Sequence, residues 1–196
     1  RGAFTVRSLA GLIRNCGILR PNAISMIPQA YQLYRSGAKS THPKGTEATL
    51  FRRSYAVADI VPIKFIGVWD TVGSLGNPLF LNGIISRRYK FHDTDLSSIV
   101  SFAYQALAID EKRRHFEPAL WRQQPHAVNQ KLEQVWFVGV HSNIGGGYPS
   151  TALSDIPLLW MCGKAKACGL ELDQIPTRED VSQQPDETWT GFYRLI

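Results

Sequence analysis

The sequence has few cysteines and no long apolar run, and both shortages limit what the chain can be. It holds 3 cysteines among 196 residues. Cys16, Cys162 and Cys168 lack the paired spacing of a metal site and cannot all pair within one chain, so we expect buried thiols in a reducing compartment. No stretch approaches the roughly 18 consecutive apolar residues that a membrane-spanning helix needs. We therefore expect neither a disulfide scaffold nor a membrane-spanning helix in this chain.

Motifs for nucleotides, nucleic acids and metals are also missing. The run of glycines from Gly145 to Gly147 lacks the Lys-Ser/Thr of a phosphate-binding loop and the G-x-G-x-x-G order of a dinucleotide site. Basic residues outnumber acidic ones by 22 to 16, which gives a net charge of +6. Their clusters are short and not interleaved with aromatic residues, which argues against nucleic acid. We expect no cofactor and no metal; the positive charge is either a solvated face or a peripheral contact with an anionic membrane.

Length and composition favour one domain over residues 1–196. The chain is 44% hydrophobic and 19% charged, as is usual for a globular protein, and 196 residues suffice for one sizeable core. Its opening, "RGAFTVRSLAGLIRNCG", shows helical spacing of apolar residues but no initiator methionine and no signal-peptide pattern. We expect a domain that is truncated at its N-terminus. The aromatic residues before Ile196 are compatible with a further element after that residue.

Two apolar runs predict buried strands that each end on a polar residue. "VPIKFIGVWDTVGSLGNP" delivers Asp70 to a glycine-containing loop, and "VWFVGVHSNIGGGYP" stops on His141. Helices are predicted for residues 4–16, for residues 96–110 and from Ser154, with a short helix within "AISMIPQAYQLYRSG" and a mobile surface loop over residues 37–46. The order helix, strand, helix, strand, helix favours an α/β fold with a mostly parallel sheet and helices on both faces.

Asp70 and His141 are the candidate site residues, because ligands of open parallel sheets bind beyond the carboxyl ends of the strands. An acid that orients a histidine is two thirds of a hydrolase triad. Gly145, Gly146 and Gly147 are expected to let the loop turn tightly and to place the histidine. Plainer interpretations stay open, since Asp70 alone is compatible with a turn-forming residue and His141 alone with a structural histidine.

The nucleophile of such a triad is missing from the chain. In α/β-hydrolases it occupies a G-x-S-x-G elbow between a strand and a helix, and precedes the acid and the histidine. Arg1-Gly2 fits the final two positions of that elbow, which places the serine directly before Arg1. Ser8 and Ser142 are weaker alternatives, because neither has the flanking glycines of the elbow.

Five segments in order resemble a known family. The segments are "RGAFTVRSLAGLIRNCGIL", "FIGVWDTVGSLG", "ALAIDEKRRHFEPALW", "VWFVGVHSNIGGGYP" and "LSDIPLLWM". Together they are similar to the uncharacterised α/β-hydrolase domain family that includes phospholipase effectors of bacterial type VI secretion. The resemblance implies a three-layer α/β-hydrolase-like fold, catalytic roles for Asp70 and His141, and an oxyanion-hole backbone N–H at Arg1. The chain departs from the family pattern at Asn143, where the family often has aspartate.

Two functions remain open at this point. The first is a serine-type hydrolase of carboxylic esters, with phospholipid as its substrate. The second is a noncatalytic, degenerate hydrolase fold that binds an acidic partner. The residue directly before Arg1 discriminates between them.

Overall fold

The computed structural model describes residues 2–72, 95–175, 177–178, 180, 182–186 and 188. In chain order the elements are α1 (Gly2–Cys16), the 3-10 segment η1 (Pro21–Met26), α2 (Ile27–Arg35), η2 (Lys39–Thr41), α3 (Thr46–Tyr55), β1 (Ile63–Trp69), β2 (Val100–Ala108), η3 (Arg114–Phe116), β3 (Lys131–Phe137), α4 (His141–Gly145) and α5 (Ala152–Ala167). The three strands form one parallel sheet in the order β1-β2-β3. The described part of the chain therefore has an α/β fold.

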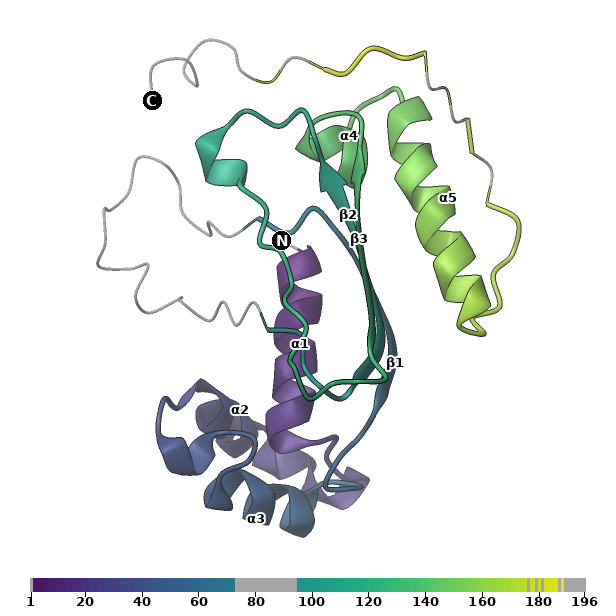
Figure 1. Cartoon of the computed structure of the whole chain (residues 1–196). Helices are drawn as coiled ribbons and strands as arrows, with labels where there is room; N and C mark the ends of the chain where they lie inside the picture. The colour runs from purple at the N-terminus through teal and green to yellow at the C-terminus, as the bar shows by residue number, and fades with distance from the viewer. Residues whose placement is uncertain are drawn as a thin grey trace.

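Helices cover both faces of this sheet (Figure 1). On one face, Ala10 of α1 packs with Ile66 and Val68 of β1. On the other, Met161 of α5 packs with Tyr104 of β2. Alternate residues of a strand point to opposite faces, so each strand contributes to two cores. The predicted arrangement of helices on both sides of a parallel sheet is confirmed for these elements.

The helices α2 and α3 pack against α1 near its C-terminal end (Figure 1). Arg52 links α3 to α1 and to the segment before β1, because its guanidinium donates to the Asn15 carbonyl at 2.9 Å and to the Asp59 carboxylate at 2.8 Å. Gly17 ends α1 with a φ of 74°, a conformation that glycine adopts without strain. No helix in the described residues is long and apolar enough to cross a membrane.

Residues 96–110 contain a strand, so the predicted helix is wrong. β2 is the middle strand and is covered on both faces, and seven of its nine residues are buried. Such a strand has a nearly continuous apolar sequence without alternation. Periodicity alone cannot distinguish that pattern from a buried helix. The apparent helical spacing in "LSSIVSFAYQALAID" thus comes from burial on both faces.

The segment before β1 is more ordered than the sequence indicated. Residues 37–46, predicted as a surface loop, contain the 3-10 segment η2, whose Thr41 is buried. α3 follows directly and was not predicted, because its apolar residues are few and no strong cap precedes it. The predicted short helix corresponds to α2, and α5 begins at Ala152, two residues before the predicted start.

Candidate active site

Asp70 lies at the carboxyl end of β1 with its side chain buried. Its backbone N–H continues the ladder by donating to the Ala106 carbonyl at 2.8 Å. The residue is 2% exposed and has a φ of 30°, a left-handed conformation that aspartate tolerates better than most residues. One carboxylate oxygen, Oδ1, accepts from the Ala108 N–H at 3.2 Å. Backbone groups of β2 therefore hold Asp70 in place.

His141 begins the short helix α4, four residues after the end of β3. The turn between them uses Gly139, which has a φ of 120° and donates its N–H to Asp110 Oδ2 at 2.7 Å. A Cβ at this glycine would lie 2.5 Å from the Cβ of Asn143. The sequence predicted a strand that ends on His141. In the structure a turn follows β3, and His141 is instead the first residue of α4.

The structure brings the two predicted residues together. Nδ1 of His141 lies 2.7 Å from Oδ2 of Asp70, and the two side chains are 28% and 1% exposed, respectively. Because a carboxylate only accepts hydrogen bonds, Nδ1 carries the hydrogen and Nε2 of a neutral ring is left as the acceptor. Nε2 has no hydrogen-bond partner among the described residues. This is the arrangement in which an imidazole can take a proton from a nucleophile.

A second set of residues, which sequence reasoning missed, supports the histidine. Glu111 accepts from the His141 N–H at 3.3 Å through Oε2 and binds the Arg113 guanidinium at 2.8 and 2.7 Å. The guanidinium lies 3.7 Å from the ring centroid of Phe116, and that ring contacts His141 edge-on at 5.1 Å. These residues follow β2 at the same edge of the sheet. Their motif, "DEKRRHF", could have indicated the site had residues 96–110 been read as a strand.

The charge of Glu111 is maintained by its partners. Burial raises the pKa of this carboxyl group, but hydrogen bonds from Arg113 and from the His141 backbone outweigh it, so the pKa lies below its ordinary value. The anion faces the histidine backbone, and Arg113 balances its charge. The pair thus fixes the start of α4 without adding net charge beside the ring.

Four of the remaining predicted site residues, all glycines, are described by the structure. Gly145 ends α4, and Gly146 and Gly147 have φ values of 80° and 123°, conformations that glycine adopts without strain. A Cβ on any of the three would meet nothing within 4 Å, so a close approach to other backbone is not what requires glycine. Gly2 is the exposed first residue of α1, and Arg1 lies outside the described residues.

The N-terminal half of α1 lies at the same edge of the sheet as Asp70. Arg7 of α1 donates to the Ala119 carbonyl at 2.6 Å, and the Ala119 N–H donates to the Thr71 carbonyl at 2.7 Å. Figure 1 shows the start of α1 near the carboxyl ends of the strands. Ser8, by contrast, bonds Tyr34 at 3.1 Å and not His141. The described residues contain no group of three or more His, Cys, Asp or Glu able to hold a metal ion.

The fold and this pair define a class: an α/β domain with an Asp–His pair beyond the carboxyl ends of its parallel strands. Comparison with known proteins then gives the family. The model of the T6SS phospholipase effector Tle1-like catalytic domain matches residues 1–164, and the chain belongs to this family. The family description is that of a phospholipase effector catalytic domain, and the match covers most of the chain.

A yeast protein is also similar. The chain is 30% identical over 131 residues to the uncharacterized protein YEL023C of Saccharomyces cerevisiae, which covers 64% of this chain and 18% of that protein. The chain thus spans less than a fifth of that relative's length. No solved structure matches the chain.

Proposed function

We propose that this domain hydrolyses carboxylic esters of phospholipids with a Ser–His–Asp triad on an α/β-hydrolase fold. The observation that carries the proposal is the 2.7 Å contact between His141 Nδ1 and Asp70 Oδ2, with Nε2 left as the acceptor. Family membership supports the substrate class. The nucleophile is a serine directly before Arg1.

The chemistry has two steps. In the first, Nε2 of His141 takes the serine proton as the hydroxyl oxygen attacks the ester carbonyl, and then returns that proton to the leaving alcohol. In the second, His141 takes a proton from the water that attacks the acyl-enzyme, and then returns that proton to the serine oxygen as the fatty acid is released. Asp70 holds the ring in the required tautomer and stabilises the imidazolium. The backbone N–H of Arg1 is one donor of the oxyanion hole.

The position of α1 supports this placement of the serine. A nucleophile elbow lies between a strand and the N-terminus of a helix, beyond the carboxyl end of the sheet. The start of α1 lies at that edge, where Arg7 is linked through Ala119 to Thr71, the residue after Asp70. This position of α1 supports a nucleophile that precedes the helix and acts together with the acid–histidine pair.

The experiment is an esterase assay on the protein extended upstream of Arg1, first with a short-chain p-nitrophenyl ester and then with phospholipid. We expect His141→Ala and Asp70→Asn to lower kcat by about 10³- to 10⁴-fold, as in other triads. His126→Ala is the matched control, because His126 is exposed and lies in a polar segment. Full activity in both triad variants would refute the proposal, and inactivity of a folded extended protein would favour the noncatalytic module.

A further inference from the structure

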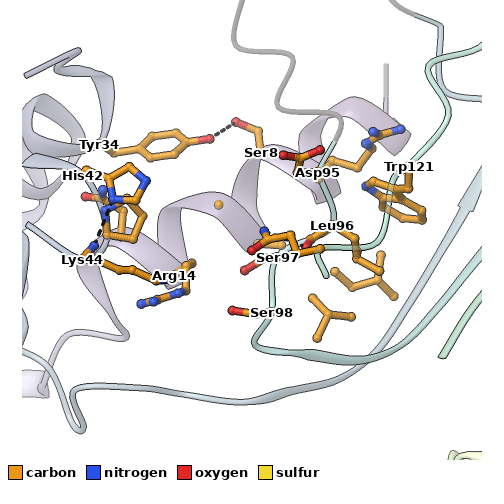
Figure 2. Close-up of a pocket in the computed structure, with 18 of the residues that line it drawn as sticks. Ser8, Arg14, Tyr34, His42, Lys44, Asp95, Leu96, Ser97, Ser98 and Trp121 are labelled. Carbon is orange, nitrogen blue, oxygen red and sulfur yellow. Dashed lines mark hydrogen bonds between the residues drawn. The ribbon is translucent and has the colours of Figure 1, made fainter. Parts of the chain in front are cut away.

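A cavity of about 390 Å³ lies along α1, and Figure 2 shows part of its lining. One face of the helix lines it, because the lining residues recur at intervals of three and four. They are Phe4, Arg7, Ser8, Ala10, Gly11, Arg14 and Asn15. The segment around Leu96 and Ser97 and the loop with His42 and Lys44 form other walls. Neither Asp70 nor His141 is among the described residues that line the cavity.

Arg14, at one end of the cavity, is a cation without an ion-pair partner among the described residues. The Arg14 guanidinium makes no hydrogen bond or ion pair within the described part of the chain. Burial, followed by repulsion from Arg52, lowers the pKa of Arg14. The nearby Asp59 carboxylate is bound to Arg52 at 2.8 Å. A partly desolvated guanidinium without a partner is costly unless an anion binds it.

Other charges around the cavity do not neutralise Arg14. Lys44 lies at the same end and adds a second cation (Figure 2). The Asp95 carboxylate, which also lines the cavity, is paired with Arg122 at 3.4 Å. Arg7 is engaged by the Ala119 carbonyl and lies 4.5 Å from the Trp121 ring centroid. This end of the cavity is therefore complementary to an anion.

Away from Lys44, the lining includes apolar side chains and two buried hydroxyl groups (Figure 2). Its apolar lining includes Ile66, Leu96 and Trp121. Ser97 Oγ and Thr71 Oγ1 are buried without a hydrogen-bond partner in the described residues, and Thr71 is 3% exposed. A ligand that lies against this part of the lining therefore needs an apolar segment.

We propose that this cavity binds a single-chain anionic amphiphile, with its anionic head on Arg14 and its chain against Ile66, Leu96 and Trp121. Guanidinium recognises phosphate and carboxylate alike through paired N–H groups, so both head groups fit. The volume lies near the lower end of the about 300 to 1,000 Å³ of small-molecule sites, which favours one chain over two.

The cavity reaches Phe4 and Thr71, but its Arg14 end lies far from the start of α1. Arg14 lies ten residues beyond Phe4, or about 15 Å along the helix at 1.5 Å per residue. The phosphate of a phospholipid is only a few bonds from its ester groups, so a lipid whose ester reached the start of α1 would not place its own phosphate on Arg14. The bound amphiphile is therefore a second molecule, distinct from the ester that is hydrolysed.

Calorimetric titration of the protein with octyl phosphate, below its micelle concentration, tests the proposal. We expect binding that weakens by about fourfold for each methylene removed on going to hexyl and butyl phosphate. Arg14→Gln should weaken binding by at least about tenfold, because a hydrogen-bonded charge is lost. Arg14→Lys should weaken it less, since the charge remains. Octanoate tests the carboxylate head group, and its Arg14-dependent binding would equally support the proposal.

Arg53→Gln is the matched control, because Arg53 is an exposed arginine of α3 outside the lining of the cavity. It should leave binding unchanged. Arg14→Gln should also keep its melting temperature, since the guanidinium has no partner to lose, and this separates a binding role from a structural one. The proposal would be overturned if octyl phosphate did not bind, or if octanol or inorganic phosphate bound as tightly as octyl phosphate. Equal losses of affinity in Arg14→Gln and Arg53→Gln would also overturn it. The readout is independent of ester hydrolysis.

Discussion

Three residues around His141 contact it and orient its ring. Asp70 Oδ2 contacts Nδ1 at 2.7 Å, and Glu111 Oε2 accepts from the backbone N–H at 3.3 Å. Phe116 lies edge-on to the ring at 5.1 Å. Contacts to both the backbone and the ring restrict its rotation, which is what preorganisation of a general base requires.

Glu111 makes the stability of this region depend on pH. Its pKa is lowered in the folded protein, so its stabilising effect is present above the ordinary value of 4.5 and is lost as pH falls through the folded value. We expect Glu111→Gln to destabilise the protein by about 2 kcal/mol at pH 7, because the hydrogen bonds to a charged group are lost. Below pH 4.5 the difference from the wild type should shrink.

Urea unfolding at several pH values between 7 and 3 measures this dependence. Glu117→Gln is the control, because Glu117 is an exposed glutamate on the same segment. A constant difference between Glu111→Gln and the wild type across this range would contradict the account.

At the scale of elements, the turn from β3 into α4 determines where His141 lies. We expect Gly139→Ala to destabilise the protein by about 1 to 3 kcal/mol, because glycine has a φ of 120° there and a Cβ would lie 2.5 Å from Asn143. Gly145→Ala should be neutral or stabilising, since the added methyl meets nothing within 4 Å at the end of α4. Chemical unfolding measures both changes. Equal effects of the two substitutions would show that the turn does not require glycine at position 139.

Asn143 connects α4 to the C-terminal segment. Its Nδ2 donates to Asp186 Oδ2 at 2.8 Å, and its Oδ1 accepts from the Val140 N–H at 3.1 Å. We expect Asn143→Asp to release residues 182–186, because two carboxylates would face each other at this distance. Limited proteolysis should then cut this segment faster than in the wild type, whereas Gln183→Glu, farther from α4, should change little. Unchanged cleavage in Asn143→Asp would contradict this role.

The sequence predicted those elements that have a clear local pattern of apolar residues. β1 is an apolar run that ends before Asp70, and α1 and α5 have helical spacing with glycine stops. β3 covers Lys131–Phe137 and ends four residues before His141; only its apolar second half was recognised, because its first half is mostly polar. β2 was misread because burial on both faces removes alternation. α3 was missed because its tertiary contact, centred on Arg52, has no local signal. The contact of Asp70 with His141 was predicted from strand ends, whereas Glu111 was not, because its role depends on the position of β2.

At the scale of the whole molecule, the net charge of +6 is complementary to anionic lipid surfaces. We expect the protein to bind vesicles that contain phosphatidylglycerol more tightly than vesicles of phosphatidylcholine. Raising the salt from 0.1 M towards 1 M should weaken this binding, because the screening length falls from about 10 to about 3 Å. Vesicle sedimentation measures it. Equal binding to both vesicles, or no effect of salt, would contradict an electrostatic contact.

The central claim is that His141, oriented by Asp70, activates a serine directly before Arg1. Labelling of the upstream-extended protein with a fluorophosphonate, followed by mass spectrometry of its peptides, tests this claim most directly, because the reagent modifies activated serines. The account predicts a single adduct on the serine before Arg1, lost in His141→Ala and retained in His126→Ala. An adduct at another serine, or labelling that persists without His141, would contradict it.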